Sequence, residues 1–231
     1  RLTLAGQILY VGIFLFCFMA YLELFRADYY ERKGTLTLLF ALIVFFPVLS
    51  SIMMEQNLSS IYVVPFAMIP IIVRVFLDSR TAFMAHVTII LLCSITLRFP
   101  HEFILLQVVA GMVAIYSLRE LSQRSQLLRT ALFISYALLY FAFELIHEDD
   151  LTKLNTRMYI YFMINGILLL FAYPLLFLLE KIFGFTSDVT LVELSNINNS
   201  LLREMSEVAP GTFQHSLQMA NLAAAAANKI G

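Results

Sequence analysis

The residues of this chain whose types suit chemistry are few and far apart. Three of its four histidines, His86, His101 and His147, lie within or beside long apolar runs, and His215 stands in a more polar tail. One histidine holds a catalytic metal only with partners, because such sites use at least three protein ligands. Without further ligands, the simpler interpretation of His215 is therefore a packing or capping role.

Polar residues inside the apolar runs form a second group of candidates, because a bilayer makes buried ionisable groups costly and often functional. The candidates are His86, Arg74 and Glu144, with Asn165 and Gln107 as neutral cases. Arg74 and Glu144 lie near the ends of their runs, where snorkelling to the membrane surface explains them. His86 lies deeper, and the alternative to a ligand there is a hydrogen-bonded packing histidine.

The composition shows what must position these residues. Of 231 residues, 61% are hydrophobic and 13% are charged, against roughly 25% charged in a soluble domain. This excludes an ordinary soluble globule and a disordered chain, and the net charge of −1 gives no basic excess for a nucleic acid polymer. Cys17 and Cys93 both lie in apolar runs, so no disulfide is expected.

The apolar residues fall into segments of membrane-spanning length. Uniformly apolar segments favour helices, because lipid offers no partner for exposed backbone groups. The sequence therefore predicts an all-α, polytopic bundle of seven spans within residues 1–184. The spans are expected at residues 4–25, 35–54, 61–77, 81–97, 103–118, 130–146 and 159–179. Prolines inside the spans, at positions 47, 65, 70 and 174, should kink their helices.

The basic residues of the loops predict the orientation. Lys and Arg gather in the first, third and fifth loops and after the seventh span, and cytoplasmic loops are the ones enriched in these residues. This distribution places the N-terminus outside and the C-terminus in the cytoplasm.

The tail after the last span changes character. Apolar residues spaced by three or four between Leu191 and Val208 predict a connector helix within residues 185–210. Such a helix could be a connector that packs on a partner, or it could form a homodimer. The alternative is that it is one helix of a small domain. Pro210-Gly211 should then break the chain, with Thr212 capping a helix over residues 213–230.

One run in this tail is more specific. The sequence Ala209-Pro210-Gly211-Thr212-Phe213-Gln214-His215-Ser216 resembles the opening of an HD-type phosphohydrolase domain. With the preceding connector and the seven-span layout, the chain is similar to the seven-transmembrane proteins with an intracellular HD hydrolase, the PgpH-type cyclic-di-AMP phosphodiesterases. This resemblance implies that residues 211–231 begin an HD domain.

The resemblance also implies an activity for the parent protein. An all-helical cytoplasmic HD domain would hold two divalent metals, manganese or iron, and hydrolyse cyclic di-AMP to a linear dinucleotide at the bacterial cytoplasmic membrane. His215 matches the first histidine of the metal-ligand set, and paired metals lower the pKa of a bridging water. Because the chain carries only this one ligand, we expect it to bind no catalytic metal tightly and to be inactive by itself.

Two other functions stay open at this point. One is a receptor or transporter-like bundle that docks a cytoplasmic partner without catalysis of its own. The other is an HD domain that acts on a different nucleotide.

Overall fold

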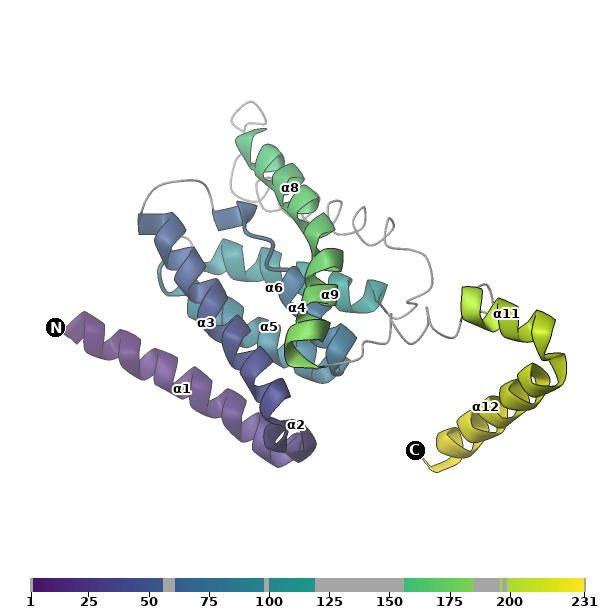
Figure 1. Cartoon of the computed structure of the whole chain (residues 1–231). Helices are drawn as coiled ribbons and strands as arrows, with labels where there is room; N and C mark the ends of the chain where they lie inside the picture. The colour runs from purple at the N-terminus through teal and green to yellow at the C-terminus, as the bar shows by residue number, and fades with distance from the viewer. Residues whose placement is uncertain are drawn as a thin grey trace. The chain divides into compact units, whose positions relative to one another are not determined.

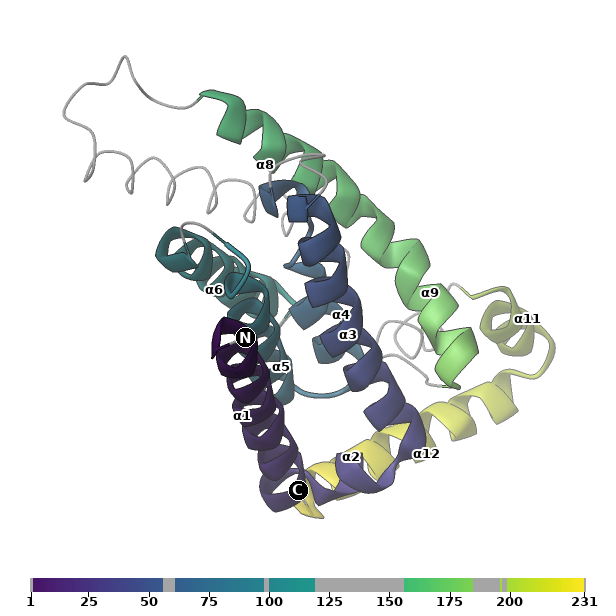
Figure 2. The same ribbon diagram turned by 90° about the vertical axis from the view of Figure 1, so that its left-hand side faces the viewer.

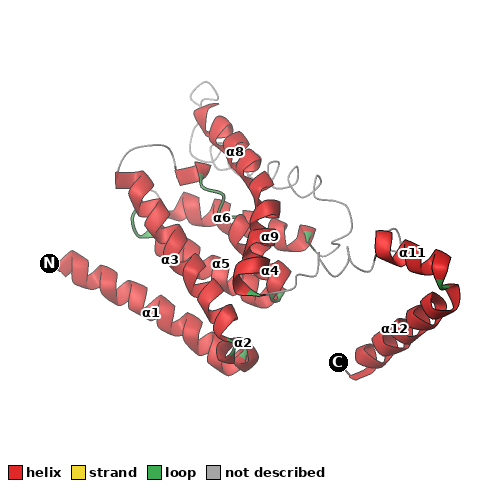
Figure 3. Cartoon of the chain, viewed as in Figure 1, coloured by secondary structure: helices red, strands yellow, loops and turns green. Residues whose placement is uncertain are grey.

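The computed structural model describes residues 2–55, 61–97, 100–118, 156–184, 196 and 199–230. Every regular element in this part of the chain is helical (Figure 3), which confirms the all-α prediction. The chain divides into two compact units, Arg1–Thr186 and Ser187–Gly231, and each is described by itself.

The first unit is a bundle built around one helix (Figure 1). Its elements are α1 (Leu2–Phe25), α2 (Ala27–Glu31), α3 (Lys33–Glu55), η1 (Ile61–Val63), α4 (Met68–Phe76), α5 (Ser79–Ser94), α6 (Pro100–Ser117), α8 (Thr156–Leu168), η3 (Leu169–Phe171) and α9 (Ala172–Phe183). The helix α5 packs against α1, α3, α4 and α6, so it forms the centre of the unit.

The helix α1 lies antiparallel to α5, and Figure 2 shows the two side by side. The hydroxyl of Tyr10 donates to the carbonyl of Leu91 at 3.3 Å, and the hydroxyls of Tyr21 and Thr81 lie 3.3 Å apart. Apart from the buried Phe18 and Leu22, α1 exposes most of its apolar side chains. A helix that is apolar all round yet exposed is suited to lipid as its surroundings.

Three helices of the described residues are long and apolar enough to cross a membrane by themselves: Thr3–Phe25, Lys33–Glu55 and Pro100–Ser117. They correspond to the first, second and fifth predicted spans. A fourth crossing is obtained if the bent pair Tyr159–Phe171 and Pro174–Phe183 is counted as one span. The sixth predicted span, residues 130–146 with Glu144, lies outside the described residues.

The prediction of a single span at residues 61–77 is wrong. The segment is broken into η1 and α4 around Pro65, which has no N–H to continue a helix. The helix α4 has nine residues, about 14 Å of helix, and almost all of its side chains are buried. It is therefore a core helix, and α4 by itself is too short to cross a hydrocarbon layer about 30 Å thick.

The fourth predicted span is shorter than a full crossing. The helix α5 has 16 residues, or about 24 Å, and ends at Ser94. The hydroxyls of Ser94 and Thr96 there donate to the carbonyls of Leu91 and Cys93 at 2.7 and 3.0 Å. Side chains that bond nearby carbonyls compete with continued helix, which accounts for the early end. The structure of the described residues thus supports fewer than the seven full spans that the sequence predicted.

The second unit contains α11 (Ser200–Val208) and α12 (Pro210–Ile230), which pack on each other. The side chain of Asn199 caps α11 by accepting from the N–H of Leu201 at 3.2 Å. The prediction that Thr212 caps the last helix is wrong, because α12 already begins at Pro210. Proline suits the first helical position, where its missing N–H has no intrahelical partner to lose. Most of the preceding connector, including Leu191, lies outside the described residues.

Candidate functional site

The broken segment between η1 and α4 is held by Asn165 of α8. The side-chain amide nitrogen of Asn165 donates to the carbonyls of Tyr62 and Val64, each at 2.9 Å. Asn165 is 1% exposed, so both bonds lie inside the bundle. Irregular backbone at membrane depth needs such partners, because lipid supplies none. The predicted intramembrane polar site at Asn165 is thus a bridge between α8 and an irregular segment.

Aromatic rings surround the same broken segment. The ring of Phe66 lies 5.2 Å from that of Phe103 and 5.7 Å from that of Phe46, and the ring of Tyr62 lies 5.9 Å from that of Phe162. The hydroxyl of Tyr62 donates to Oε1 of Glu102, at the start of α6, at 2.7 Å. Sequence reasoning missed this Tyr62–Glu102 contact, and its two partners carry no local motif that could have revealed it.

His86 is fully buried between α5 and α6. Its Nε2 lies 2.8 Å from the backbone carbonyl of Gln107, so this nitrogen must donate. The ring fills the space beside Gly111, where an added Cβ would overlap the imidazole. Nδ1 of His86 is buried and has no hydrogen-bond partner among the described residues. This geometry favours a packing role for His86 over a role as a ligand.

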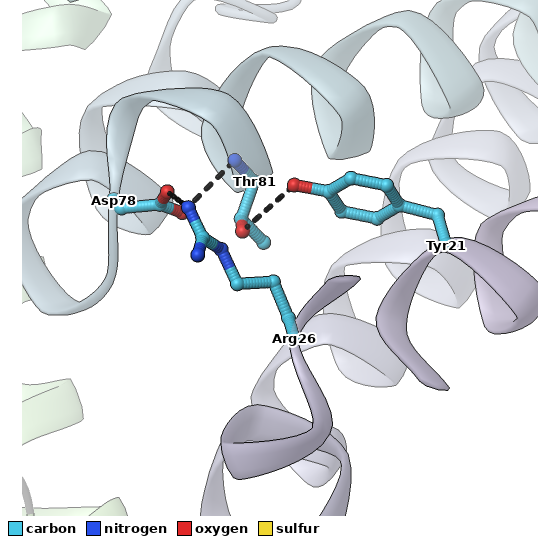
Figure 4. A network of polar contacts seen from close by, with 4 residues as sticks. All are labelled: Tyr21, Arg26, Asp78 and Thr81. Atoms are coloured by element: carbon cyan, nitrogen blue, oxygen red, sulfur yellow. Dashed lines mark hydrogen bonds and ion pairs between the residues drawn. The ribbon is translucent and has the colours of Figure 1, made fainter. Parts of the chain in front are cut away.

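A polar cluster joins the end of α1 to the start of α5 (Figure 4). The guanidinium of Arg26 forms an ion pair with the carboxylate of Asp78. Asp78 also caps α5, accepting from the N–H of Thr81 at 3.0 Å, and Thr81 contacts Tyr21. The topology accounts for this cluster, since the first and third loops of an alternating bundle must lie at the same end.

The pKa of Asp78 reflects competing effects in this cluster. Partial burial raises the pKa, but hydrogen bonds from Thr81 and Arg26 and the charge of Arg26 outweigh it and hold the pKa below its ordinary 3.8. The hydrogen bond and charge of Asp78 in turn raise the pKa of Arg26. Both groups therefore stay charged at neutral pH.

Replacing Asp78 should weaken the start of α5 and remove an acid-sensitive part of the stability. Asp78→Ala deletes the helix cap, a loss of about 0.5–2 kcal/mol. Because the folded pKa is lowered, the stabilisation is present above the ordinary pKa and disappears as the pH falls through the folded one. Both effects are measured by the melting temperatures of the detergent-purified chain and of Asp78→Ala, compared between neutral pH and about pH 3.

The exposed Asp28 of α2 offers a matched control for this measurement. Asp28→Ala should leave the melting temperature and its acid sensitivity nearly unchanged. If Asp78→Ala kept the acid sensitivity of the unmodified chain, the role assigned to Asp78 would be wrong.

Arg74 lies in the last turn of α4, where a cation complements the helix dipole. Its side chain is half-buried, and Nε has no hydrogen-bond partner among the described residues. Arg74, His86 and Asn165 sit on three different helices, and the bonds of His86 and Asn165 go to different backbone carbonyls. The structure therefore does not bring these three predicted residues together into one site.

His215 is exposed on the second turn of α12 in the second unit. Within the described residues, no group of three or more His, Cys, Asp or Glu side chains is arranged to hold a metal ion. The described residues therefore do not fit the two-metal centre that the resemblance implies. The assignment of His215 as a metal ligand stays a prediction.

The comparisons with known proteins identify the family. Residues 1–187 match the family described as 7TM receptor with intracellular HD hydrolase. The chain belongs to this family, which confirms the resemblance inferred from the sequence. It is therefore a multi-pass membrane protein by family as well as by its apolar helices.

Two curated relatives carry a more particular name. The chain is 32% identical over 189 residues to the cyclic-di-AMP phosphodiesterase PgpH of Listeria monocytogenes, covering 76% of this chain and 26% of that protein. It is 26% identical over 247 residues to PgpH of Bacillus subtilis, covering 99% of this chain and 34% of that protein. The chain thus spans between a quarter and about a third of the length of these relatives.

A shorter match links the chain to an uncharacterized protein of Synechocystis sp., 48% identical over 52 residues, 22% of this chain and 6% of that protein. No solved structure matches the chain.

Proposed function

We propose that this chain is the membrane module of a metal-dependent HD phosphodiesterase that hydrolyses cyclic di-AMP in the bacterial cytoplasm. The observation that carries the proposal is the family match over residues 1–187, together with two relatives named as cyclic-di-AMP phosphodiesterases. The division of the chain into two compact units, Arg1–Thr186 and Ser187–Gly231, supports a separate domain after the membrane part. In this proposal residues 1–184 anchor and sense, residues 185–210 connect, and residues 211–231 begin the HD domain.

The proposed substrate follows from the names of the relatives and the proposed ligand role from the A-P-G-T-x-x-H-S run. His215 would be the first ligand of a pair of divalent metals, manganese or iron, completed by residues outside this chain. The chain by itself is then expected to be inactive.

The test is hydrolysis of cyclic di-AMP by the full-length protein in manganese. His215→Ala should reduce hydrolysis to background and lower the bound manganese measured by elemental analysis, because a two-metal centre loses a ligand. His101→Ala, an exposed histidine on α6, is the matched control and should keep both values. Hydrolysis by His215→Ala at the unmodified rate would remove His215 from the metal site, and no hydrolysis by any form would reject the proposed function.

We also propose that the N-terminus lies outside and the C-terminus in the cytoplasm. The Arg26–Asp78 pair draws the first and third loops to one end of the bundle; the first loop carries Arg26, Arg32 and Lys33, and the third carries Arg80. This orientation needs an odd number of crossings, so the proposal keeps seven, and residues 61–77 cross as a broken segment, η1 and α4.

Cysteine labelling in intact cells tests this orientation. In a Cys17→Ser background, a cysteine at Lys33 should resist a membrane-impermeant maleimide, whereas a cysteine at His101 should react. Both positions are exposed, so access to the reagent and not burial decides the result. The reverse labelling pattern would overturn the orientation.

A further inference from the structure

Arg74 is a half-buried cation near one end of the bundle. It lies in the last turn of α4, whose other side chains are almost all buried. Its Nε is shielded from solvent and has no hydrogen-bond partner, and among the described residues no Asp or Glu forms an ion pair with it. A guanidinium stays charged in proteins, and a half-buried charge without a counter-ion is costly. The described residues therefore leave Arg74 without the anion that this position favours.

The nearest acid along the chain is already engaged elsewhere. Asp78 follows Arg74 by four residues, which is the spacing of an ion pair on a continuous helix. However, α4 ends at Phe76, so the two residues do not share a helix. The carboxylate of Asp78 instead pairs with Arg26 and caps α5 (Figure 4). The helix dipole of α4 attracts a cation at this end, but it supplies no counter-ion.

The Arg26–Asp78 pair also indicates the depth of Arg74 in the membrane. Arg26 directly follows Thr3–Phe25, a helix long and apolar enough to cross a bilayer, so the pair marks the membrane surface at this end. Four residues separate Arg74 from Asp78, a distance of at most about 14 Å along the chain. A long arginine side chain reaches the surface from such a position by snorkelling. The anions found at that depth are the phosphates of phospholipid headgroups.

We propose that Arg74 binds the phosphate of an anionic phospholipid, in the leaflet that faces the first and third loops. Part of Arg74 stays exposed, so a headgroup can reach it, and the forked N–H groups of arginine match two phosphate oxygens. A lipid with net negative charge suits an unpaired cation better than one whose phosphate is balanced by its own choline. This lipid site goes beyond the proposed hydrolysis and does not depend on it.

Native mass spectrometry of the detergent-purified whole chain tests the site, with phosphatidylglycerol or phosphatidylcholine added at equal concentration. We expect more bound phosphatidylglycerol than phosphatidylcholine, and we expect added inorganic phosphate to leave the bound lipid in place. Arg74→Gln should weaken phosphatidylglycerol binding about fivefold, the contribution of one arginine near an anionic surface. Arg74→Lys should lose less, because lysine keeps the charge without the fork.

Arg32→Gln is the matched control, because it removes one fully exposed arginine from the same end of the bundle. It should leave phosphatidylglycerol binding nearly unchanged, since the proposed site depends on the half-buried Arg74 and not on surface charge in general. The control is needed because Asp28 and Glu31 are also exposed at this end, so the surface there is of mixed charge.

Three results would overturn the lipid site. They are equal binding of the two lipids to the unmodified chain, equal loss of binding in Arg74→Gln and Arg32→Gln, and displacement of the lipid by inorganic phosphate. The comparison of the two lipids needs no variant, so it decides the matter even if Arg74→Gln does not fold. The readout is bound lipid and not hydrolysis, so such a failure leaves the proposed activity untouched.

Discussion

Gly111→Ala should lower the stability of the membrane unit by about 2–4 kcal/mol, the largest loss expected from adding a single methyl group to this chain. The added Cβ would occupy the position of the His86 imidazole. The ring is stiff and fully buried, so it must leave its place or force α5 and α6 apart. Overpacking of this kind costs about 1–3 kcal/mol, and losing the bond to the carbonyl of Gln107 adds a similar amount.

The measurement is thermal unfolding of the detergent-purified chain, followed by the fraction that stays monodisperse after heating. The expected loss corresponds to a fall of roughly 5–15 °C in apparent melting temperature for a chain of this size. Gly12→Ala is the matched control, since nothing lies within 4 Å of an added Cβ at Gly12. It should be neutral or slightly stabilising, because alanine favours helix over glycine.

A double variant separates the proposed clash from a general intolerance at Gly111. His86→Ala removes the ring, so Gly111→Ala should cost less in that background than in the unmodified chain. Equal melting temperatures for Gly111→Ala and Gly12→Ala would show that Gly111 does not lie as close to the His86 ring as described.

The parts of the fold that the sequence predicted well are those that local composition determines. Long runs with almost no charge, such as α1 with Glu23 as its single charged residue, must be helical in lipid whatever they pack against. The break at residues 61–67 also follows from a local cause, because Pro65 cannot continue a helix. What local composition could not show is that α4 is buried on nearly all sides, since an apolar helix suits both lipid and protein.

The candidate sites were harder to predict, because their partners are distant in the sequence. The sequence singles out His86 and Asn165 as polar residues in apolar runs, but their partners are backbone carbonyls 21 and more than 100 residues away. A backbone carbonyl has no sequence signature. Gly111 went unnoticed for the same reason, since only the neighbouring ring explains why this position lacks a side chain.

The tail motif shows the opposite case. The residue types and spacing from Pro210 to His215 led to the family prediction, whereas the family match covers residues 1–187 and the exposed position of His215 on α12 says little about metal binding. The position of the cap was mispredicted, because Thr212 looked like a helix start while Pro210 was already suited to the first turn.

Asn165→Asp should be the more damaging of two changes at the bridge between α8 and the broken segment. The amide nitrogen of Asn165 faces two carbonyl oxygens at 2.9 Å, so only a donor suits this position. Aspartate keeps the shape but places an oxygen there. An ionised carboxylate would then face two carbonyls in a buried site, at an expected cost of about 3–5 kcal/mol.

Asn165→Leu should be milder than the aspartate variant. It removes both donated bonds, but it also removes Oδ1, which is buried and has no hydrogen-bond partner among the described residues. The carbonyl of Val64 keeps the bond from the N–H of Phe66 at 2.9 Å, so the expected loss is about 1–3 kcal/mol. Ile164→Leu, at an exposed neighbouring position, is the control and should be neutral.

Melting of the three purified variants in detergent measures this order. The distance between spin labels at Ile160 and Leu105, measured by double electron–electron resonance in a Cys17→Ser, Cys93→Ala background, checks its cause, because both positions are exposed. If Asn165 fixes α8 by donating to the broken segment, both substitutions at Asn165 should broaden that distance, and Ile164→Leu should not. Asp and Leu variants of equal stability, with an unchanged distance, would show that packing alone holds α8. In that case Phe162 and its aromatic neighbours, and not the amide of Asn165, would hold α8 in place.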